Sequence, residues 1–450
     1  MQHYEILVIG GGPAAISLVK VIGTHFKTGV IRPEDHSLIY CAMPYAIEQL
    51  IPVQKTFKRD ELVLSAGADL LRDTCSAVDF DAKVVTTLGG EQYSYSKLVV
   101  ATGAKPVLPP LPGSGLPGVH TFKTEADMLA LSAVLEQGAT HAAVIGAGAI
   151  GIELAQALAS RGLETHLVDI ASSILPNMAD PDMLGGPTEE LVKAGIHLHL
   201  GQGVAALNGT DRVESIQLTN GEAIHLAQDD CSTSSKSAQT RPLVVFAVGM
   251  RPDTELFQGS ALEMGRQGII VNGRMETSIP DVYAIGDCVQ FSSAITGELQ
   301  PGKLATNAVP MGKLLGKNLL GGNVEYQGFY NGAATKVGMW YVGSVGLTET
   351  QARSRYPVLV GEAELTTTFP IMPEAKAARL KVVVNKETGL LLGAQITSGA
   401  PVADKVDQLT MAIQYGIKAS DLEFFSYSSQ PYQSYYPADN LLIHAIKDLK

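Results

Sequence analysis

Short apolar runs alternate with helical patterns along this chain, and glycines stand at the junctions between them. Residues 4–9 read YEILVI and are followed by GGGPAA and then by the helical pattern ISLVKVI. Residues 141–145 read HAAVI and are followed in the same way by GAGAIGIELAQAL. An apolar run of strand length, a turn and a stretch of helical period together predict a strand–turn–helix unit. We therefore expect an α/β fold that contains two such units.

The first glycine turn has the form GxGxxA, in which Gly10, Gly12 and Ala15 are the fixed positions. The first glycine permits a tight turn, the second lets a pyrophosphate approach the backbone, and the small third residue lets helix and strand pack closely. The free N–H groups and the positive dipole end of the helix then face the phosphates. This pattern predicts a dinucleotide site, with Pro13 and Ala14 as further members.

An acidic side chain is expected about 20 residues after such a turn, where it binds the ribose hydroxyls. The second strand is predicted at residues 28–31, and Arg32 rather than an acid follows it. Glu34 and Asp35 come slightly later than expected. We favour Glu34 as the ribose-binding residue and keep Asp35 as the alternative.

The second turn has the complete form GxGxxG, with Gly146, Gly148 and Gly151 as its glycines. Ile150 lies within this turn, and Glu153 follows at the start of the predicted helix. The pattern predicts a second dinucleotide site with the same roles for its three glycines.

The strand after this second helix is predicted at residues 165–168 and ends at Asp169, 18 residues after Gly151 (151 to 169). A carboxylate at this spacing accepts hydrogen bonds from the ribose diol and repels a 2′-phosphate. Residues 170–173 contain no Arg or Lys that could hold such a phosphate. The second site is therefore predicted to bind NADH rather than NADPH.

Composition narrows the class of protein further. Of 450 residues, 46% are hydrophobic and 17% charged, with a net charge of -12, which fits a globular protein and excludes a broad nucleic-acid surface. No apolar run predicts a membrane span, and the N-terminus lacks the basic segment of a signal peptide. The 4 cysteines form no CxxC pair and the 10 histidines no HxxxH or HExxH spacing, so we expect neither a disulfide scaffold nor a metal site. These features favour a cytoplasmic setting.

Three further segments complete a pattern of five motifs. They read LVVATGA (98–104), VVFAVGMRP (244–252) and IPDVYAIGDC (279–288). In this order the motifs resemble those of the pyridine nucleotide–disulfide oxidoreductase superfamily, and the resemblance covers nearly the whole chain. It implies that the first site binds FAD, with Asp287 of the GD motif near the ribityl chain and pyrophosphate. Further cofactor-binding residues implied by these motifs are Ala101, Thr102, Gly103 and Gly249.

The resemblance also implies a domain order. A split FAD domain would comprise residues 1–110 and 245–322, and an NAD domain of residues 111–244 would be inserted into it. Residues 323–450 would form an α+β interface domain that makes a homodimer. Residues 229–240 (DDCSTSSKSAQT) are polar and of low complexity, which predicts a surface loop.

The expected redox chemistry lies in the segment SLIYCAMPYAI, residues 37–47. Glutathione-reductase-type members of the family carry two cysteines five positions apart here, whereas this chain has Cys41 and Ala46. One thiol remains, at the start of a predicted helix, where the helix dipole lowers a thiol pKa. Such a thiol cycles through sulfenic acid, a mixed disulfide or a persulfide. We therefore expect Cys41 to be redox-active.

With one cysteine here, the chain resembles the single-cysteine branch of the family, that of coenzyme A-disulfide reductases, NADH oxidases and NADH peroxidases. The water-forming oxidase and peroxidase types carry a histidine just after the first glycine turn, and GGGPAAIS has none. The stretch CAMPY is more similar to the CALPY-type stretch of the coenzyme A-disulfide reductases. The resemblance therefore favours a thiol-derived disulfide over an oxygen species as the small-molecule acceptor.

In coenzyme A-disulfide reductases a tyrosine of the partner subunit reaches the cysteine. The Pro–Tyr pair at 431–432 matches that motif, which makes Tyr432 the candidate proton donor, ahead of Tyr435 and Tyr436. Two departures count against coenzyme A as the specific substrate. Phe369 stands at the place of the family's second active-site tyrosine, and Tyr40 precedes the cysteine in place of a small amide.

The resulting prediction is an FAD-dependent enzyme that passes electrons from NADH through FAD to Cys41 and on to a disulfide, persulfide or polysulfide. Three alternatives remain. The first is an NADH oxidase or peroxidase, and the second is a ferredoxin or rubredoxin reductase in which Cys41 is incidental. The third is a redox-sensing flavoprotein without enzymatic activity.

Overall fold

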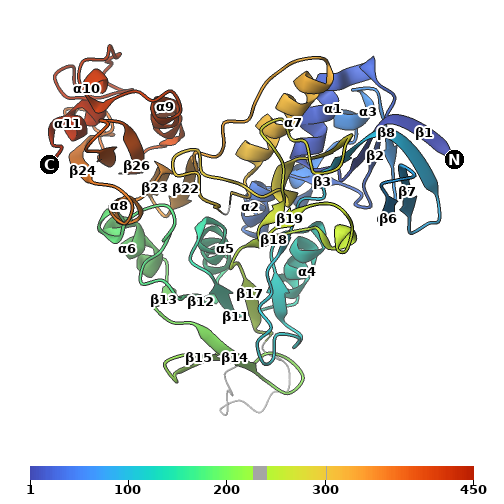
Figure 1. Cartoon of the computed structure of the whole chain (residues 1–450). Helices are drawn as coiled ribbons and strands as arrows, with labels where there is room; N and C mark the ends of the chain where they lie inside the picture. The colour runs from blue at the N-terminus through green and yellow to red at the C-terminus, as the bar shows by residue number, and fades with distance from the viewer. Residues whose placement is uncertain (227–240, 301) are drawn as a thin grey trace, which may run out of the picture.

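The computed structural model describes residues 1–226, 241–300 and 302–450, which form three lobes (Figure 1). Each lobe is built around its own main β-sheet. The chain begins in the N-terminal lobe and ends in the C-terminal lobe, at opposite ends of the molecule, and the middle lobe joins them. The segment 229–240, which we expected to be a surface loop, lies outside the described residues.

The N-terminal sheet has a parallel centre. Strand β1 (Gln2–Ile9) pairs in parallel with β2 (Thr28–Ile31) and with β8 (Gln92–Val100). Strand β21 (Val282–Ala284) also pairs in parallel with β8, although it comes from far along the chain. The N-terminal lobe is therefore assembled from two stretches that flank the middle lobe in sequence. Its other strands are β5 (Ala68–Leu71), β6 (Cys75–Asp79) and β7 (Val84–Thr87).

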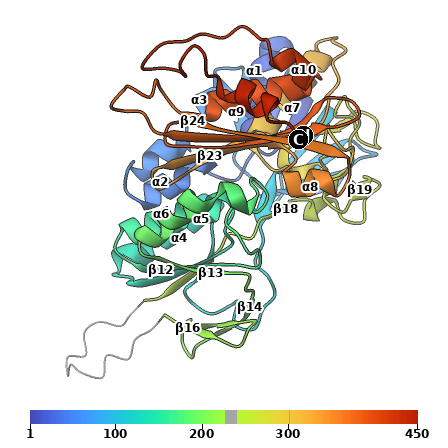
Figure 2. The same ribbon diagram turned by 90° about the vertical axis from the view of Figure 1, so that its left-hand side faces the viewer.

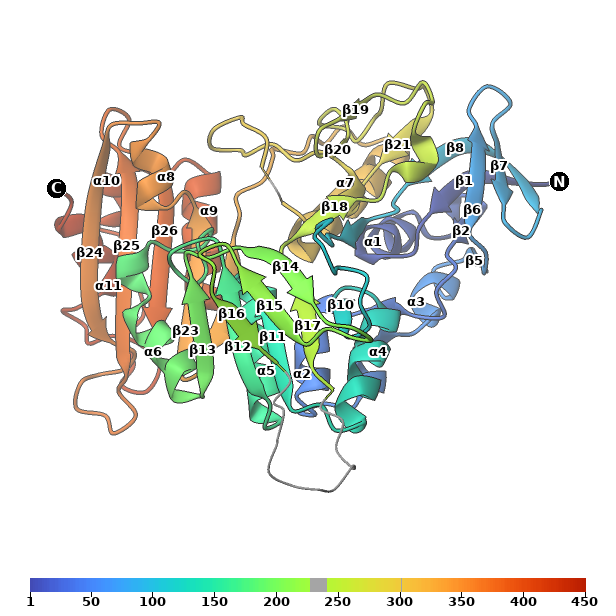
Figure 3. The ribbon, with the colours of Figure 1, turned by 90° about the horizontal axis from the view of Figure 1, so that it is seen from below.

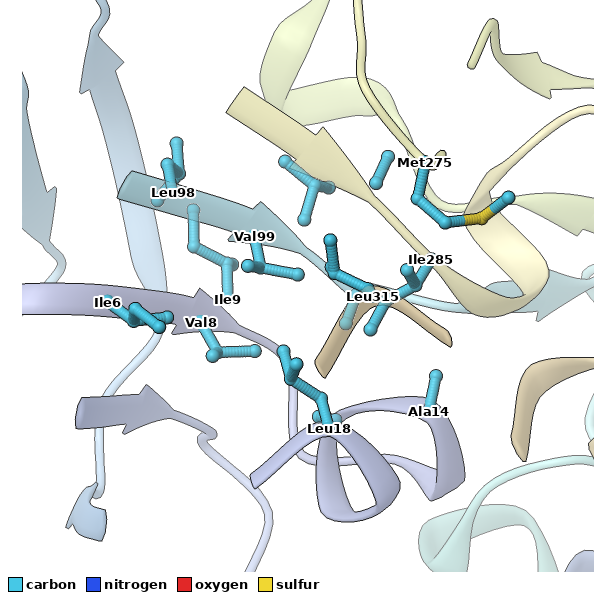
Figure 4. Packing of buried hydrophobic residues seen from close by; sticks show 14 of the residues in the cluster. Ile6, Val8, Ile9, Ala14, Leu18, Leu98, Val99, Met275, Ile285 and Leu315 are labelled. Atoms are coloured by element: carbon cyan, nitrogen blue, oxygen red, sulfur yellow. The ribbon is translucent and has the colours of Figure 1, made fainter. Parts of the chain in front are cut away.

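The core of this lobe is closed by α1 (Pro13–Ile22) and α7 (Ala305–Leu319). Figure 4 shows side chains of β1 and β8 packed with Leu18 of α1 and Leu315 of α7. The two helices can approach closely because Gly312 has no side chain. A Cβ at this position would lie only 2.2 Å from the carbonyl oxygen of Ala14. The helix that follows the first glycine turn is thereby fixed on both sides. The short elements of this lobe are α3 (Glu61–Leu64), β19 (Met264–Gly265) and β20 (Gly268–Ile269). The segment with β3 (Ser37–Leu38), α2 (Met43–Ile47) and β4 (Phe57–Lys58) instead packs its apolar residues into the core of the middle lobe.

The middle sheet is entirely parallel. Alternate residues of its strands enter two different cores, because successive side chains of a strand point to opposite faces. Leu243 and Val245 pack with the helices on one face, whereas Val244 and Phe246 pack with a small antiparallel sheet on the other. The main strands, in spatial order, are β10 (Val119–Thr121), β17 (Leu243–Phe246), β11 (His141–Ile145), β12 (Glu164–Asp169) and β13 (Ile196–Leu200). The other elements are α4 (Glu125–Glu136), α5 (Ala149–Ser160), α6 (Gly185–Lys193), β14 (Val204–Asn208), β15 (Ser215–Leu218) and β16 (Ala223–His225).

The C-terminal lobe holds an antiparallel sheet of a different kind. Figure 2 shows this sheet edge-on, with α9 (Ala403–Gln414) and α10 (Ala419–Leu422) on one side and the middle lobe on the other. Its strands, in spatial order, are β22 (Ala333–Val337), β23 (Trp340–Gly346), β26 (Leu391–Ser398), β25 (Ala377–Asn385) and β24 (Val358–Thr366). Helices α8 (Glu349–Arg353) and α11 (Leu441–Lys447) complete it. Two Rossmann-like sheets and a C-terminal α+β lobe confirm the predicted fold class.

Buried polar contacts hold the middle lobe against both neighbours, between which it lies in Figure 3. Asp180 and Gln395 exchange two hydrogen bonds of 2.6 Å, one from the backbone N–H of Asp180 and one from the amide of Gln395. The Asp180 carboxylate also accepts from the backbone N–H of Glu349, at the start of α8. On the other side, Arg161 at the end of α5 donates to the carbonyl oxygen of Ile47 in α2 (2.9 Å). Within the described part of the chain, no helix combines the length and apolar character needed to cross a membrane.

Four histidines gather on one face of the middle sheet. His166 on β12 is hydrogen-bonded to His199 on β13 (Nδ1 to Nε2, 3.1 Å), and its ring stacks on His197 with centroids 4.9 Å apart. Glu164 lies 3.4 Å from His141 and 3.5 Å from His166. Burial, with the neighbouring His199 and His197 adding to it, lowers the pKa of His166 to about 4.

This histidine makes the protein sensitive to acid. At pH 7.5 His166 is neutral in both the folded and the unfolded state, so it does not affect the free energy of unfolding. Below pH 6.5 it becomes protonated in the unfolded state but stays neutral in the folded state. The free energy of unfolding therefore falls as the pH is lowered to about 4. We expect about 2 kcal/mol of stability to be lost from this group between pH 7.5 and pH 5. Urea midpoints at the two pH values measure it. This loss of stability should be smaller in His166→Gln and unchanged in the exposed control His225→Gln. An unchanged loss in His166→Gln would show that another group causes the acid sensitivity.

Candidate functional site

The first glycine turn leaves an opening above Gly12. Gly10 has a φ of +108°, and a Cβ there would lie 2.1 Å from the carbonyl oxygen of Ala101, so glycine is required. A Cβ at Gly12, by contrast, would meet no described atom within 4 Å. Helix α1 starts at Pro13, so its free backbone N–H groups face this opening, where they can bind a phosphate. Gly11, Ala14 and Ala15 of the turn are buried.

The second glycine turn repeats this geometry in the middle lobe. Gly146 has a φ of +112°, and a Cβ at Gly148 would again meet no described atom within 4 Å. A Cβ at Gly151 would lie 1.8 Å from the carbonyl oxygen of Gly146, so this glycine lets α5 pack against the turn. Ile150 is exposed at the start of α5. We predicted that Glu153 starts the helix, and this is wrong: α5 begins at Ala149, so Glu153 lies one turn inside it.

Asp169 ties the second turn to the segment that follows β12. One carboxylate oxygen accepts the backbone N–H of Ala147 in the turn (2.6 Å), and the other accepts that of Ala171 (2.7 Å). The carboxylate is therefore fixed at the carboxyl end of the strand, beside the opening above Gly148. This is the position from which an acid reaches the ribose of a dinucleotide.

The corresponding acid of the first turn lies in a loop beyond β2. Glu34 and Asp35 are both exposed, and their backbone carbonyl groups accept hydrogen bonds from the buried Arg32 (3.0 and 3.3 Å). The guanidinium of Arg32 also pairs with Asp60 at 2.6 Å. An arginine therefore occupies the end of the strand, and the acids follow it.

The ATG segment and Gly249 mark the two passages between the N-terminal and middle lobes. The Thr102 hydroxyl donates to the carbonyl oxygen of Asp253 (2.6 Å), and the N–H of Asp253 donates to Gly103 (2.9 Å). Gly249 accepts from Val107 (3.0 Å). Between these contacts the short strands β9 (Ala104–Pro106) and β18 (Met250–Pro252) pair with each other. The structure thus brings these two motifs together next to the first turn.

Asp287 is a largely buried carboxylate without full partners, and its side chain is 15% exposed. Its Oδ1 atom has no hydrogen-bond partner among the described residues, and its Oδ2 lies 3.8 Å from the ammonium of Lys123. Burial raises the pKa of Asp287, and the charges of Lys123 and Lys303 oppose this. Lys303 donates to the Asp287 backbone carbonyl (2.7 Å). Sequence analysis missed Lys123, since no spacing rule connects it with a GD motif 164 residues later (123 to 287).

Cys41 is exposed and free. It lies in a 3-10 turn (Tyr40–Ala42), and the α-helix that we predicted to start at the cysteine starts at Met43 and has only 5 residues. Proline is tolerated in the first turn of a helix but not further in, so Pro44 keeps Cys41 outside. The ring of Tyr40 lies under the ammonium of Lys123, 4.0 Å from its centroid. Because Lys123 also lies 3.8 Å from Asp287, it connects the neighbour of Cys41 with the Asp287 carboxylate.

A half-buried carboxylate, that of Glu153, connects the cysteine segment with the other two lobes. Glu153 on α5 accepts a hydrogen bond from the hydroxyl of Thr335 on β22 (2.8 Å). Burial raises the pKa of Glu153, and interactions with Thr335 and with the Tyr45 hydroxyl partly offset this. Burial also raises the pKa of Tyr45 to about 12, with contributions from Glu153 and Cys41. The second turn, the cysteine segment and the C-terminal lobe therefore meet at Glu153.

The tail of the C-terminal lobe brings two predicted positions together. The backbone N–H of Phe369 donates to the carbonyl oxygen of Pro431 (3.1 Å), so Phe369 and Tyr432 come from adjacent segments. Tyr432 is 61% exposed. Tyr436 packs its edge against Phe369 at 5.3 Å, and Tyr435 is largely buried. Of the three tyrosines, Tyr432 is the most available to a second subunit.

These observations agree with comparisons to known proteins. The sequence pattern described as pyridine nucleotide-disulphide oxidoreductase matches residues 4–312, and that of the family's dimerisation domain matches residues 333–431. The chain belongs to the pyridine nucleotide-disulphide oxidoreductases. It is an FAD-dependent NADH oxidoreductase, and its dimerisation domain makes it a homodimer.

Several members of the family are similar over almost the whole chain. An NADH oxidase of Methanocaldococcus jannaschii is 32% identical over 94% of both chains. A CoA-dependent NAD(P)H sulfur oxidoreductase of Pyrococcus furiosus is 28% identical over 96% of both. The structure of an NAD-dependent persulfide reductase from A. fulgidus superposes with a TM-score of 0.89 at 27% identity and covers 98% of this chain and 82% of its own. Since these relatives are enzymes, the non-enzymatic alternative is wrong.

The residues present fit both cofactors. The opening above Gly12 and the unpartnered oxygen of Asp287 offer the first turn's N–H groups and a buried carboxylate to FAD. The opening above Gly148, with Asp169 beside it, offers the same elements to NADH. Among the residues that the structure describes, no group of three or more His, Cys, Asp or Glu side chains could hold a metal ion.

Proposed function

We propose that this oxidoreductase reduces sulfur–sulfur bonds through Cys41. The observation that carries the proposal is Cys41, the one exposed thiol among the cysteines that the structure describes, with Ala46 buried where a second cysteine would stand. Its neighbour Tyr40 contacts Lys123, which in turn lies beside Asp287. Without an internal partner, the thiol is free to form a mixed disulfide or a persulfide with a small molecule. Relatives named sulfur oxidoreductase and persulfide reductase support this acceptor class.

When bound, NADH and FAD supply the hydride and the electron transfer. The Cys41 thiolate attacks one sulfur of an acceptor R–S–S–R′. A bond forms between Cys41 Sγ and the sulfur of RS, which gives a mixed disulfide, and the S–S bond of the acceptor breaks and releases R′S⁻. Two electrons from NADH then cleave the mixed disulfide, restore the thiolate and release RS⁻. The two thiolates take up protons from solvent or from a nearby phenol. The protein's part is to hold Cys41 next to the proposed flavin site.

The three predicted acidic cofactor residues Asp169, Glu34 and Asp287 each have a proposed role in this scheme. Asp169 accepts the ribose hydroxyls of NADH and disfavours NADPH, since residues 170–173 offer no cation to a 2′-phosphate. Glu34 takes the ribose of FAD, and Asp287 faces its ribityl chain. The domains predicted from the sequence are residues 1–110 with 245–322 for FAD, 111–244 for NAD and 323–450 for dimerisation. We move the second NAD boundary from residue 244 to Phe246, because Val245 and Phe246 still pair with the middle sheet.

Tyr432 is the proposed proton donor at Cys41 of the partner subunit. Its exposure leaves it free for a second copy, and the adjacent Phe369 cannot donate a proton. A cytoplasmic location is also proposed, because a reactive free thiol needs a reducing compartment.

Oxygen reduction is the second candidate function. The observation in its favour is the 32% identical relative named NADH oxidase. No histidine follows the first glycine turn, where the oxidase type carries one, and this counts against it.

Rates of NADH oxidation with polysulfide, coenzyme A disulfide, peroxide and O2, measured side by side, decide between the two. We expect the sulfur acceptors to give kcat/KM values at least about tenfold above those of O2 and peroxide, and NADPH to give rates at least about tenfold below NADH. A kcat/KM with O2 that equals or exceeds those of the sulfur acceptors would overturn the proposed function in favour of the oxidase.

A further inference from the structure

Two arginines and one aspartate form a cluster around the loop after β2, which we call the arginine clamp (Arg32, Arg72 and Asp60). Arg32 is 2% exposed, and its side chain passes so close to the first glycine turn that a Cβ at Gly11 would lie 2.4 Å from its Cδ. One Asp60 oxygen pairs with Arg32 at 2.6 Å, and the other pairs with Arg72. Burial acts against the charged form of Asp60, but hydrogen bonds from both arginines hold its pKa below the usual value.

Both guanidinium groups of the clamp also bind the same two backbone carbonyls. Arg32 donates to the carbonyl oxygens of Glu34 (3.0 Å) and Asp35 (3.3 Å). Arg72 donates to the same two oxygens, with 2.9 Å to that of Asp35. Four hydrogen bonds from two fixed cations therefore determine the path of this short loop, whereas the two acidic side chains stay exposed.

The clamp lies where the ribose-binding acid of a dinucleotide site is expected. Strand β2 ends at the buried Ile31, so the acid does not stand at the strand end, where a rigid backbone would position it. The Arg32 side chain packs beside Gly11 of the first glycine turn, and it also binds the backbone of Glu34 and Asp35. The loop that carries Glu34 is therefore held next to the first glycine turn.

We propose that the arginine clamp positions the loop so that Glu34, although late in sequence, reaches the adenosine ribose of FAD. The clamp residues are positioning residues: they act on the loop backbone, and Glu34 makes the contact. The inference rests on the proposed assignment of Glu34 and the first turn to FAD. It does not depend on the electron acceptor.

Ribose selectivity tests the clamp without any turnover. The full-length protein, stripped of flavin, is titrated with FAD and with the FAD analogue that carries 2′-deoxyadenosine, and the ratio of the two dissociation constants is compared. We expect the unaltered protein to bind the analogue about tenfold more weakly, because hydrogen bonds to a charged group are lost. In Glu34→Gln and in Asp60→Asn the ratio falls to about threefold or less. A merely structural clamp would weaken both ligands equally and leave the ratio unchanged.

Two further variants keep the outcomes separate. Arg72→Met removes a side chain that is one-third exposed, so the fold tolerates it, and its ratio should fall as well. Glu61→Gln, next to Asp60 and exposed, is the matched control and should keep the full ratio. A full ratio in both Asp60→Asn and Arg72→Met overturns the clamp. A full ratio in Glu34→Gln, or a loss in Asp35→Asn instead, overturns the assignment of Glu34, and neither result bears on the sulfur acceptor.

Discussion

Replacing Cys41 with serine is expected to reduce the turnover of sulfur acceptors by at least about 1,000-fold, while NADH still reduces the flavin at close to the original rate. The reason is chemical: a thiolate attacks a sulfur–sulfur bond, whereas a serine hydroxyl stays protonated near neutral pH and forms no mixed disulfide. The proposed cofactor sites consist of the glycine turns, Asp169 and Asp287, and Cys41 makes no hydrogen bond to any of them among the described residues. Stopped-flow reduction of the flavin and steady-state turnover, measured on the same preparation, separate the two half-reactions.

Cys75 offers a matched control for this experiment. It is a second free cysteine, half-buried on β6, and burial raises its pKa to about 12, so it carries almost no thiolate near neutral pH. Cys75→Ser should therefore leave sulfur reduction unchanged. Full turnover in Cys41→Ser would show that electrons leave the flavin directly. That result would favour the electron-transfer or oxygen-reducing alternatives.

The parts of the fold that sequence analysis predicted are those governed by local rules. The strands at residues 28–31 and 141–145 coincide with β2 and β11, because each is a buried apolar run that ends at a turn or a charged residue. The two glycine turns have their predicted geometry for the same reason, since a φ near +110° and a helix start are properties of a few consecutive residues.

The parts that escaped prediction depend on residues far apart in sequence. Lys123 reaches Asp287, and Asp180 reaches Gln395, only because the lobes dock. Neither pair has a spacing that a periodic pattern could reveal. The position of Cys41 is a different case: the rule that proline belongs in the first helical turn already places the helix start near Pro44, so the sequence contained that information.

The pair Gly148→Ala and Gly151→Ala should separate binding of NADH from stability of the middle lobe, although both substitutions add one methyl group to the same turn. Gly148 has a φ of -75°, which alanine adopts readily, and its Cβ would stand in the opening where the pyrophosphate has to approach. We expect the KM for NADH to rise by about 10- to 100-fold in Gly148→Ala, since a close backbone contact is lost. Flavin content and the urea midpoint of unfolding should remain those of the unaltered protein.

Gly151→Ala should give the reverse pattern. The new Cβ would lie 1.8 Å from the carbonyl oxygen of Gly146, so α5 has to move away from the turn. Overpacking of this kind costs on the order of 1–3 kcal/mol, and it appears as a lower urea midpoint. Because α5 also carries Glu153 and Gln156, which bind Thr335 and the backbone N–H of Gly338 in the C-terminal lobe, its displacement should loosen the joint between the two lobes. An unchanged KM for NADH in Gly148→Ala would mean that the dinucleotide does not cross this turn, and the assignment of the middle lobe to NADH would then have to be moved away from Gly148.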